Sequence, residues 1–165
     1  MHYRKLILLL VFTAGLTGML RLSASTITIT VTDAGDTYPY TNQLREAINT
    51  ANADTLNDYI INFNISTIGS TPVVIYLTSL LPAVTNKIVF DGTTQHGYAS
   101  GVPTVIIDGS ALSSSSVGLI FNSITGAEVK GLYLRDFYDA LVFSFCTGCK
   151  ANYNVINQNT HANII

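Results

Sequence analysis

The chain has 165 residues, of which 48% are hydrophobic and 11% are charged, and its formal net charge at pH 7 is −2. This length suits a single domain. The 8 lysines and arginines are spread along the chain, which excludes nucleic acid as a partner because phosphate binding requires clustered positive charge.

Residues 1–25 have the features of an export signal peptide. A basic pair, Arg4-Lys5, precedes an apolar core at 6–20, and small residues follow at 23–25, where we expect cleavage. Glycines and Arg21 interrupt the apolar stretch, which is too short for the roughly 20 residues of a membrane span. We therefore expect no transmembrane span after cleavage and a bacterial protein that is secreted or held at the cell surface.

Cleavage also changes the charge of the chain. Residues 26–165 retain 5 of the 8 basic residues and all 10 acidic residues, so their net charge is −5. Such an acidic, charge-poor surface is compatible with neutral or cationic glycans, or with no ligand.

The first elements of the mature chain are a strand and a helix. Residues 26–32 alternate threonine with aliphatic residues, which predicts a half-buried strand with Ile27, Ile29 and Val31 facing inward. Residues 42–52 place apolar side chains three and four positions apart, the period of one helix face. We expect Thr41 or Asn42 to cap this helix.

From residue 60 onward the sequence predicts strands. Apolar runs at 60–65, 73–78, 87–91 and 104–108 are separated by proline, glycine and serine, which are turn residues. The lack of helices between the runs argues against a doubly wound sheet. The lack of two-residue hairpin signals argues against an antiparallel meander.

An internal repeat follows. Residues 117–138 and 139–160 are two copies of a 22-residue unit, and a third copy begins at His161. At this period Leu119 falls on Leu141, Phe121 on Phe143, and Val142 on Ile164. A fixed period with apolar residues at one phase is typical of a stacked, coiled architecture.

These patterns predict an all-β fold, a right-handed parallel β-helix with coils of about 22 residues and one capping α-helix. The asparagines near the end of the second repeat are expected to hydrogen-bond turn backbones. They are Asn152, Asn154, Asn157 and Asn159. Because the last residues lie within a predicted strand, we expect 26–165 to be the N-terminal cap and first coils of a truncated domain.

Three segments resemble a known family. They are 43–52 with Gln43-Leu44-Arg45-Glu46-Ala47-Ile48, the stretch Asp91–Tyr98, and Gly131–Leu134. Together they resemble secreted bacterial right-handed parallel β-helix proteins of the pectin-lyase-like fold with an N-terminal leucine-arginine-glutamate-alanine helix. The resemblance implies export or surface display, and the enzymes of that fold are polysaccharide lyases or hydrolases, the lyases with Ca²⁺. Gln43 stands where some relatives have a cysteine, so a disulfide at that cap is not expected.

Cys146 and Cys149 form a C-x-x-C pair at the turn of the second repeat. Such a pair can be a local disulfide, a redox dithiol or half of a zinc site. Redox chemistry normally requires a thiol at a helix N-terminus, and His161 is the only further donor nearby for zinc. We therefore expect a local disulfide, with buried small residues as the alternative.

Asp91 and Asp108 each end a strand and precede glycine. In neighbouring strands the two carboxylates would attract Ca²⁺. Asp-Gly is also an ordinary turn pair, and no third acidic residue falls in register. We therefore expect no cofactor and no metal, with these two residues as the candidates for Ca²⁺.

The densest charge cluster supplies the candidates for catalysis, which are Lys130, Arg135, Asp136 and Asp139. A lyase needs a base beside a metal, and a hydrolase needs a pair of carboxylates about 5–10 Å apart. The Asp-rich and Gly-His-Gly signatures of hydrolases with the resembling fold are missing. A solvated turn between coils is therefore the preferred interpretation.

The expected function is a non-catalytic scaffold or adhesin-like surface protein that binds a polysaccharide or another cell-surface ligand. The alternative is a polysaccharide lyase or glycoside hydrolase whose active coils are missing or lie near Arg135–Asp139. A fragment without independent function is a third hypothesis. Fold class decides among none of these, and the sequence carries no signal for an oligomeric state.

Overall fold

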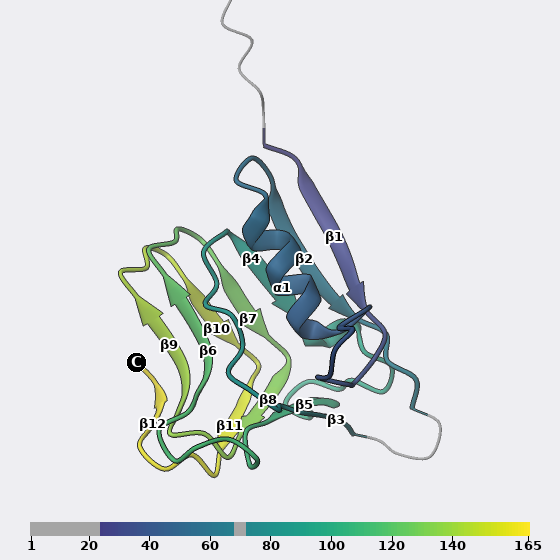
Figure 1. Cartoon of the computed structure of the whole chain (residues 1–165), viewed down its shortest axis with the longest axis vertical. Coiled ribbons are helices and arrows are strands. Elements are labelled where there is room, and N and C mark those ends of the chain that lie inside the picture. Colours follow the sequence, from purple (N-terminus) through teal and green to yellow (C-terminus); the bar gives the residue numbers. More distant parts are fainter. Residues whose placement is uncertain (1–23, 68–71) are drawn as a thin grey trace, which may run out of the picture.

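The computed structural model describes residues 24–67 and 72–165 (Figure 1). The signal peptide expected at 1–25 lies outside these residues, apart from Ala24 and Ser25. Within the described part of the chain, neither the length nor the hydropathy of any helix is sufficient for a membrane crossing.

Two helices and a series of short strands make up the described chain. The helices are α1 (Leu44–Ala53) and the 3₁₀ turn η1 (Gly92–Thr94). The strands are β1 (Thr26–Val31), β2 (Asp58–Phe63), β3 (Val73–Tyr76), β4 (Ile88–Asp91), β5 (Val105–Asp108), β6 (Val117–Asn122), β7 (Glu128–Lys130), β8 (Leu132–Arg135), β9 (Asp139–Ser144), β10 (Lys150–Asn152), β11 (Val155–Asn157) and β12 (Ala162–Ile164).

The strands form three sheets in which neighbouring strands run parallel. Their orders are β1-β2-β4-β7-β10, β11-β8-β5-β3 and β12-β9-β6. From β4 to β12 the chain enters the three sheets in rotation, so sequence neighbours such as β7, β8 and β9 belong to different sheets. Figure 1 shows these strands following one another from teal to yellow.

The predicted all-β class is wrong for this structure, which is mixed, and the predicted right-handed parallel β-helix is not shown. Of the described residues, 9% are helical and 41% lie in strands, and the small sheets neither close nor continue as a solenoid. The strands are short and the sheets small in part because residues with left-handed backbone interrupt the strands. Gly131 has φ +67° and is the single residue between β7 and β8. Since glycine adopts this conformation freely, the chain leaves one sheet there and enters the next.

The register of the strands follows the 22-residue alignment for the first two copies. Leu119 lies beside Leu141, and Phe121 beside Phe143. The third copy is displaced by one residue, because Ile164 lies beside Leu141 and not beside Val142 as predicted.

The side chain of Asp139 contacts the start of the displaced strand. Its Oδ1 accepts a hydrogen bond from the backbone N–H of Ala162 at 3.1 Å and contacts Nδ1 of His161 at 2.7 Å. These contacts hold the start of β12 opposite Asp139.

The core is built from side chains that align across neighbouring strands. Ile61, Phe90 and Val129 occupy successive positions in β2, β4 and β7, and all three are fully buried. The ring of Phe90 meets the ring of Phe121 edge-on, with centroids 5.7 Å apart. Apolar burial of this kind is the main favourable contribution to folding, and here it joins different sheets.

The first strand is less buried than its alternation predicts. Val31 is fully buried, but Ile27 is 36% exposed. The reason is the position of β1 at the edge of its sheet, with β2 as its neighbour. The threonine face is exposed as expected.

Helix α1 packs against β1 and β2 through its apolar face (Figure 1). It begins after Gln43, so the prediction of Thr41 or Asn42 as N-cap is wrong. The Gln43 side chain makes no cap hydrogen bond, and its Nε2 donates to Asp33 Oδ2 at 3.2 Å. Instead, the Glu46 carboxylate accepts a hydrogen bond from the backbone N–H of Asn42.

Two asparagines connect the repeats, as predicted. Asn154 accepts a hydrogen bond from Leu132 N at 3.0 Å and donates to Val129 O at 2.8 Å. Asn159 accepts from Phe137 N at 3.0 Å. These bonds satisfy backbone groups at turns where the sheet ladders are interrupted.

Candidate functional site

The structure joins the predicted metal ligands to the predicted catalytic bases in two ion pairs. Lys130 Nζ lies 2.9 Å from Asp91 Oδ2, and Arg135 Nη2 lies 2.7 Å from Asp108 Oδ2. Both pairs follow from strand register, because Asp91 lies beside Lys130 in β4 and β7, and Asp108 beside Arg135 in β5 and β8. Each carboxylate thus has a cation of its own.

Asp91 and Asp108 are not brought together as the Ca²⁺ hypothesis requires. β4 and β5 belong to different sheets. Within 24–67 and 72–165, no group of three or more His, Cys, Asp or Glu side chains is arranged to hold a metal ion. The residues present therefore do not fit a Ca²⁺ site that uses these two aspartates.

The ion pairs also alter the protonation of the two basic residues. The hydrogen bond to Asp91 raises the pKa of Lys130, although partial burial acts in the opposite direction. The hydrogen bond to Asp108 likewise raises the pKa of Arg135. A catalytic base works best with a pKa near the working pH, so this environment is unsuited to proton abstraction by either residue.

Asp136 and Asp139 lie on either side of a turn between β8 and β9. Asp136 has φ +60°, and its Oδ2 is 3.5 Å from Arg135 Nε. Asp139 begins β9 and pairs with His161. The ring of His161 is stacked on that of Tyr138, with centroids 4.5 Å apart and planes 2° apart. The Tyr138 ring is therefore held by stacking on His161. Along the chain, Tyr138 lies between the carboxylate residues Asp136 and Asp139.

Beside this turn is a hollow of about 240 Å³, here called the Tyr138 cleft. Its lining includes Ser110, Ser114, Asp136, Tyr138, Gln158 and Thr160. Pockets for drug-sized ligands typically measure about 300–1,000 Å³, so this cleft fits one small polar unit, such as a single sugar ring.

Most residues of the cleft were not predicted, although the repeat contains the signal for them. Asp136 and Gln158 are 22 residues apart, as are Tyr138 and Thr160. Each pair occupies the same turn in successive units, and both Asp136 and Gln158 have φ +60°. Applying the period to polar turn residues as well as to apolar ones would have grouped them.

A second hollow, of about 430 Å³, is lined mainly by apolar residues. Its floor includes Ile106, Tyr133 and Val155, which are aligned across β5, β8 and β11. It contains none of the predicted site residues, and it lacks the density of hydroxyl and amide groups found in the Tyr138 cleft.

Cys146 and Cys149 are free thiols in the structure, so the predicted disulfide is not formed in it. Burial raises the pKa of the Cys146 thiol, and a contact with Cys149 adds to this effect. A reactive thiolate requires a lowered pKa. The local environment is therefore unsuited to a redox-active dithiol.

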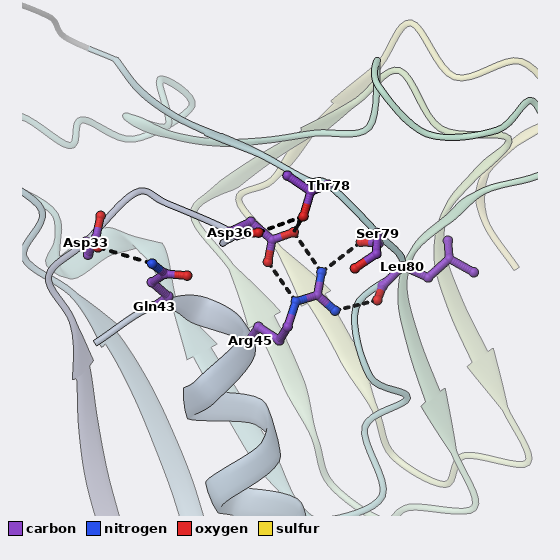
Figure 2. A network of polar contacts seen from close by, with 7 residues as sticks. All are labelled: Asp33, Asp36, Gln43, Arg45, Thr78, Ser79 and Leu80. Carbon is purple, nitrogen blue, oxygen red and sulfur yellow. Dashed lines mark hydrogen bonds and ion pairs between the residues drawn. The ribbon is translucent and has the colours of Figure 1, made fainter. Parts of the chain in front are cut away.

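A buried charged network at the start of α1 was also missed by sequence reasoning (Figure 2). Arg45 Nε and Nη2 donate to the two carboxylate oxygens of Asp36, each at 2.7 Å. Nη1 donates to Leu80 O at 2.6 Å, and Nη2 also donates to Ser79 O at 2.8 Å. The guanidinium is thereby occupied by structural contacts that attach the helix to the segment after β3.

Comparison of the chain with protein-family models, with curated proteins and with solved structures gave no match.

Proposed function

We propose that this chain is an exported, non-catalytic scaffold that binds glycans in the Tyr138 cleft. The observation that carries the proposal is the cleft lining, which combines serine and threonine hydroxyls, an amide, a carboxylate and the Tyr138 side chain. Sugars present both hydrogen-bond donors and acceptors, and serine, threonine and glutamine side chains can pair with both. An amphipathic tyrosine adds a large contact area with a polar tip.

The non-catalytic part of the proposal rests on the ion pairs. Lys130 and Arg135 have carboxylate partners that raise their pKa values. Their contacts link neighbouring strands, β4 to β7 and β5 to β8. Groups held this way contribute to the framework that positions the cleft.

Glycan binding is tested with a panel of immobilised neutral, acidic and amino polysaccharides. We expect the mature chain to bind at least one of them, and Tyr138→Ala to reduce that binding at least tenfold. Tyr76→Ala is the matched control, because Tyr76 is 55% exposed on β3 and does not line the cleft. The proposal would be contradicted if both variants lost glycan binding equally, or if the wild type bound none of the polysaccharides.

Export is tested separately, by expressing the full chain in a bacterium and sequencing the N-terminus of the material outside the cytoplasm. We expect a new N-terminus within 25–26, as the small residues there predict. Retention of the entire chain in the cytoplasm would remove this part of the proposal and leave the glycan site untouched.

Polysaccharide cleavage is a second candidate function, and the Asp139–His161 contact is the observation in its favour. An Nδ1–H of His161 that donates to the Asp139 carboxylate leaves Nε2 free to accept a proton. The test measures unsaturated products and new reducing ends on uronic-acid polymers, with and without Ca²⁺. Product formation that is lost in His161→Ala would establish this function in place of the scaffold.

A further inference from the structure

We infer that the Tyr138 cleft selects glycans that carry a protonated amine, namely sugars with a free amino group, over neutral and acidic ones. This inference rests on the proposed glycan binding and specifies its ligand. It follows from the charges around the cleft.

The cleft wall has a carboxylate but no basic side chain. Asp136 is the charged residue in the lining, and neither lysine, arginine nor histidine contributes to it. A ligand in the cleft therefore meets one negative charge directly.

The nearest cation does not neutralise that charge, because it belongs to another carboxylate. Arg135 Nη2 and Nε lie 2.7 and 2.8 Å from Asp108 Oδ2. Its closest contact with Asp136 is longer, at 3.5 Å, beyond the usual length of a charge-assisted hydrogen bond. The three residues together retain one net negative charge.

A second carboxylate lies close to the cleft. Asp139 follows Tyr138 in the chain, and its Oδ1 lies 2.7 Å from Nδ1 of His161. A charge within the Debye length, about 8 Å at physiological salt, acts on a ligand.

These charges define the ligand chemistry. An ammonium group donates charge-assisted hydrogen bonds to the carboxylate of Asp136, and these are stronger than bonds between neutral groups. The ring hydroxyls of the sugar then pair with the serine and threonine hydroxyls and with the Gln158 amide. A uronic acid in the same position would bring two carboxylates together, and like charges repel.

The experiment compares two oligosaccharides that differ only in acetylation, the β-1,4-linked oligomers of glucosamine and of N-acetylglucosamine. Dissociation constants are measured by calorimetry at one pH, at which the free amine is protonated. We expect the mature chain to bind the free-amine oligomer about tenfold more tightly, and this preference to decrease as salt is added.

Asp136→Asn is the decisive variant. Asparagine tolerates the left-handed backbone at this position, so the fold is expected to persist, and circular dichroism verifies it. The preference should fall to about one, while binding of the N-acetylated oligomer persists. Asp58→Asn, at a half-buried carboxylate of β2 outside the cleft, should keep the preference unchanged.

The outcomes distinguish a failure of the amine preference from a failure of glycan binding itself. Equal binding of both oligomers by the wild type, or an unchanged preference in Asp136→Asn, would overturn the inference and leave glycan binding standing. A folded wild type that binds neither oligomer, but does bind another polysaccharide of the panel, would also overturn the inference. Binding to no glycan at all would overturn the proposed function itself.

Discussion

Arg45 and Asp36 form the most buried ion pair described for this chain. Their side chains are 8% and 2% exposed, and Asp36 also accepts a hydrogen bond from the backbone N–H of Thr78 at 2.8 Å. Two charges removed from water are tolerated only with such complete hydrogen bonding. The pair therefore determines how α1 sits on the segment after β3.

Removing one member of this pair should be severely destabilising. Arg45→Met leaves the Asp36 carboxylate buried without a cation, and we expect the free energy of unfolding to fall by about 3–5 kcal/mol. The double variant Asp36→Asn/Arg45→Met should lose less than the sum of the single variants. Urea denaturation followed by circular dichroism measures both.

The control is Lys87→Met, which breaks an exposed pair with Asp58. Exposed pairs contribute about 0–1 kcal/mol, so a small change is expected. A loss in Lys87→Met as large as that in Arg45→Met would show that burial does not set the strength of these pairs.

Asp108 should make stability depend on pH. Burial opposes ionisation of its carboxyl, but hydrogen bonds from Ser110 and the contacts with Arg135 outweigh burial and lower its pKa. Between that lowered value and about 3.9, the usual value for aspartate, the unfolded chain holds a proton that the folded chain does not. Protonation then favours unfolding, so this stabilisation is present above about pH 4 and is lost as the pH falls through the folded pKa.

The measurement compares the wild type with Asp108→Asn, which lacks this titration. We expect the wild type to be more stable at neutral pH and the difference in unfolding free energy to shrink as the pH is lowered below about 4. Urea denaturation at a series of pH values follows it. If the difference in unfolding free energy stayed constant over the whole pH range, the pKa of Asp108 would be the same in the folded and unfolded chains, against this prediction.

At the scale of the elements, single residues with left-handed backbone direct the strands into different sheets. Gly131 lies between β7 and β8 with φ +67°. A Cβ there would approach Thr93 Cγ2 at 2.7 Å and Thr93 N at 2.8 Å. The turn therefore requires glycine both for its backbone and for the close approach of η1.

Gly131→Ala and Gly148→Ala separate these two requirements. Gly148 also has a left-handed backbone, with φ +65°, but an added Cβ would meet nothing within 4 Å. Gly148→Ala should cost about 1–2 kcal/mol from backbone conformation. Gly131→Ala should cost at least about 1 kcal/mol more from overpacking. Thermal unfolding by calorimetry tests the order, and equal losses would contradict it.

At the scale of the whole molecule, the stacked side chains couple strands that are distant in sequence. The ring of Phe121 contacts that of Phe143, with centroids 5.1 Å apart, and also that of Phe90. Phe121 is fully buried, Phe143 is half-buried and Phe145 is 87% exposed. Phe121 and Phe143 share one repeat register, and the three phenylalanines form a graded series of exposure.

Truncation of each ring to alanine should follow this gradient. We expect Phe121→Ala to reduce the free energy of unfolding by about 3–5 kcal/mol. Phe143→Ala should cost less, and Phe145→Ala should stay within about 0.5 kcal/mol of the wild type. Chemical denaturation gives the three values, and a large loss in Phe145→Ala would contradict the packing described.

Local patterns predicted the helix, the strands of the repeats and the register of the first two copies. These features depend on the spacing of apolar residues such as Leu119 and Leu141, which is visible in the sequence. The all-β class was wrong because the spacing of apolar residues describes each element by itself and does not show how a helix and small sheets assemble into a mixed structure. The partners of Asp91 and Asp108 were missed for the same reason, since the sequence compares the two aspartates with each other and not with Lys130 and Arg135.

The sequence by itself determined which residues are apolar, which turns need glycine, and where the 22-residue period runs. Tertiary structure alone decided that Asp91 meets Lys130, that Asp108 meets Arg135, and that Arg45 is buried against Asp36. The residues of the pairs Asp91–Lys130 and Asp108–Arg135 are 39 and 27 positions apart. Neither separation is a multiple of the 22-residue period, so the repeat does not predict these pairs. Charge pairing depends on which strands become neighbours, and that is fixed when the sheets assemble around the shared core.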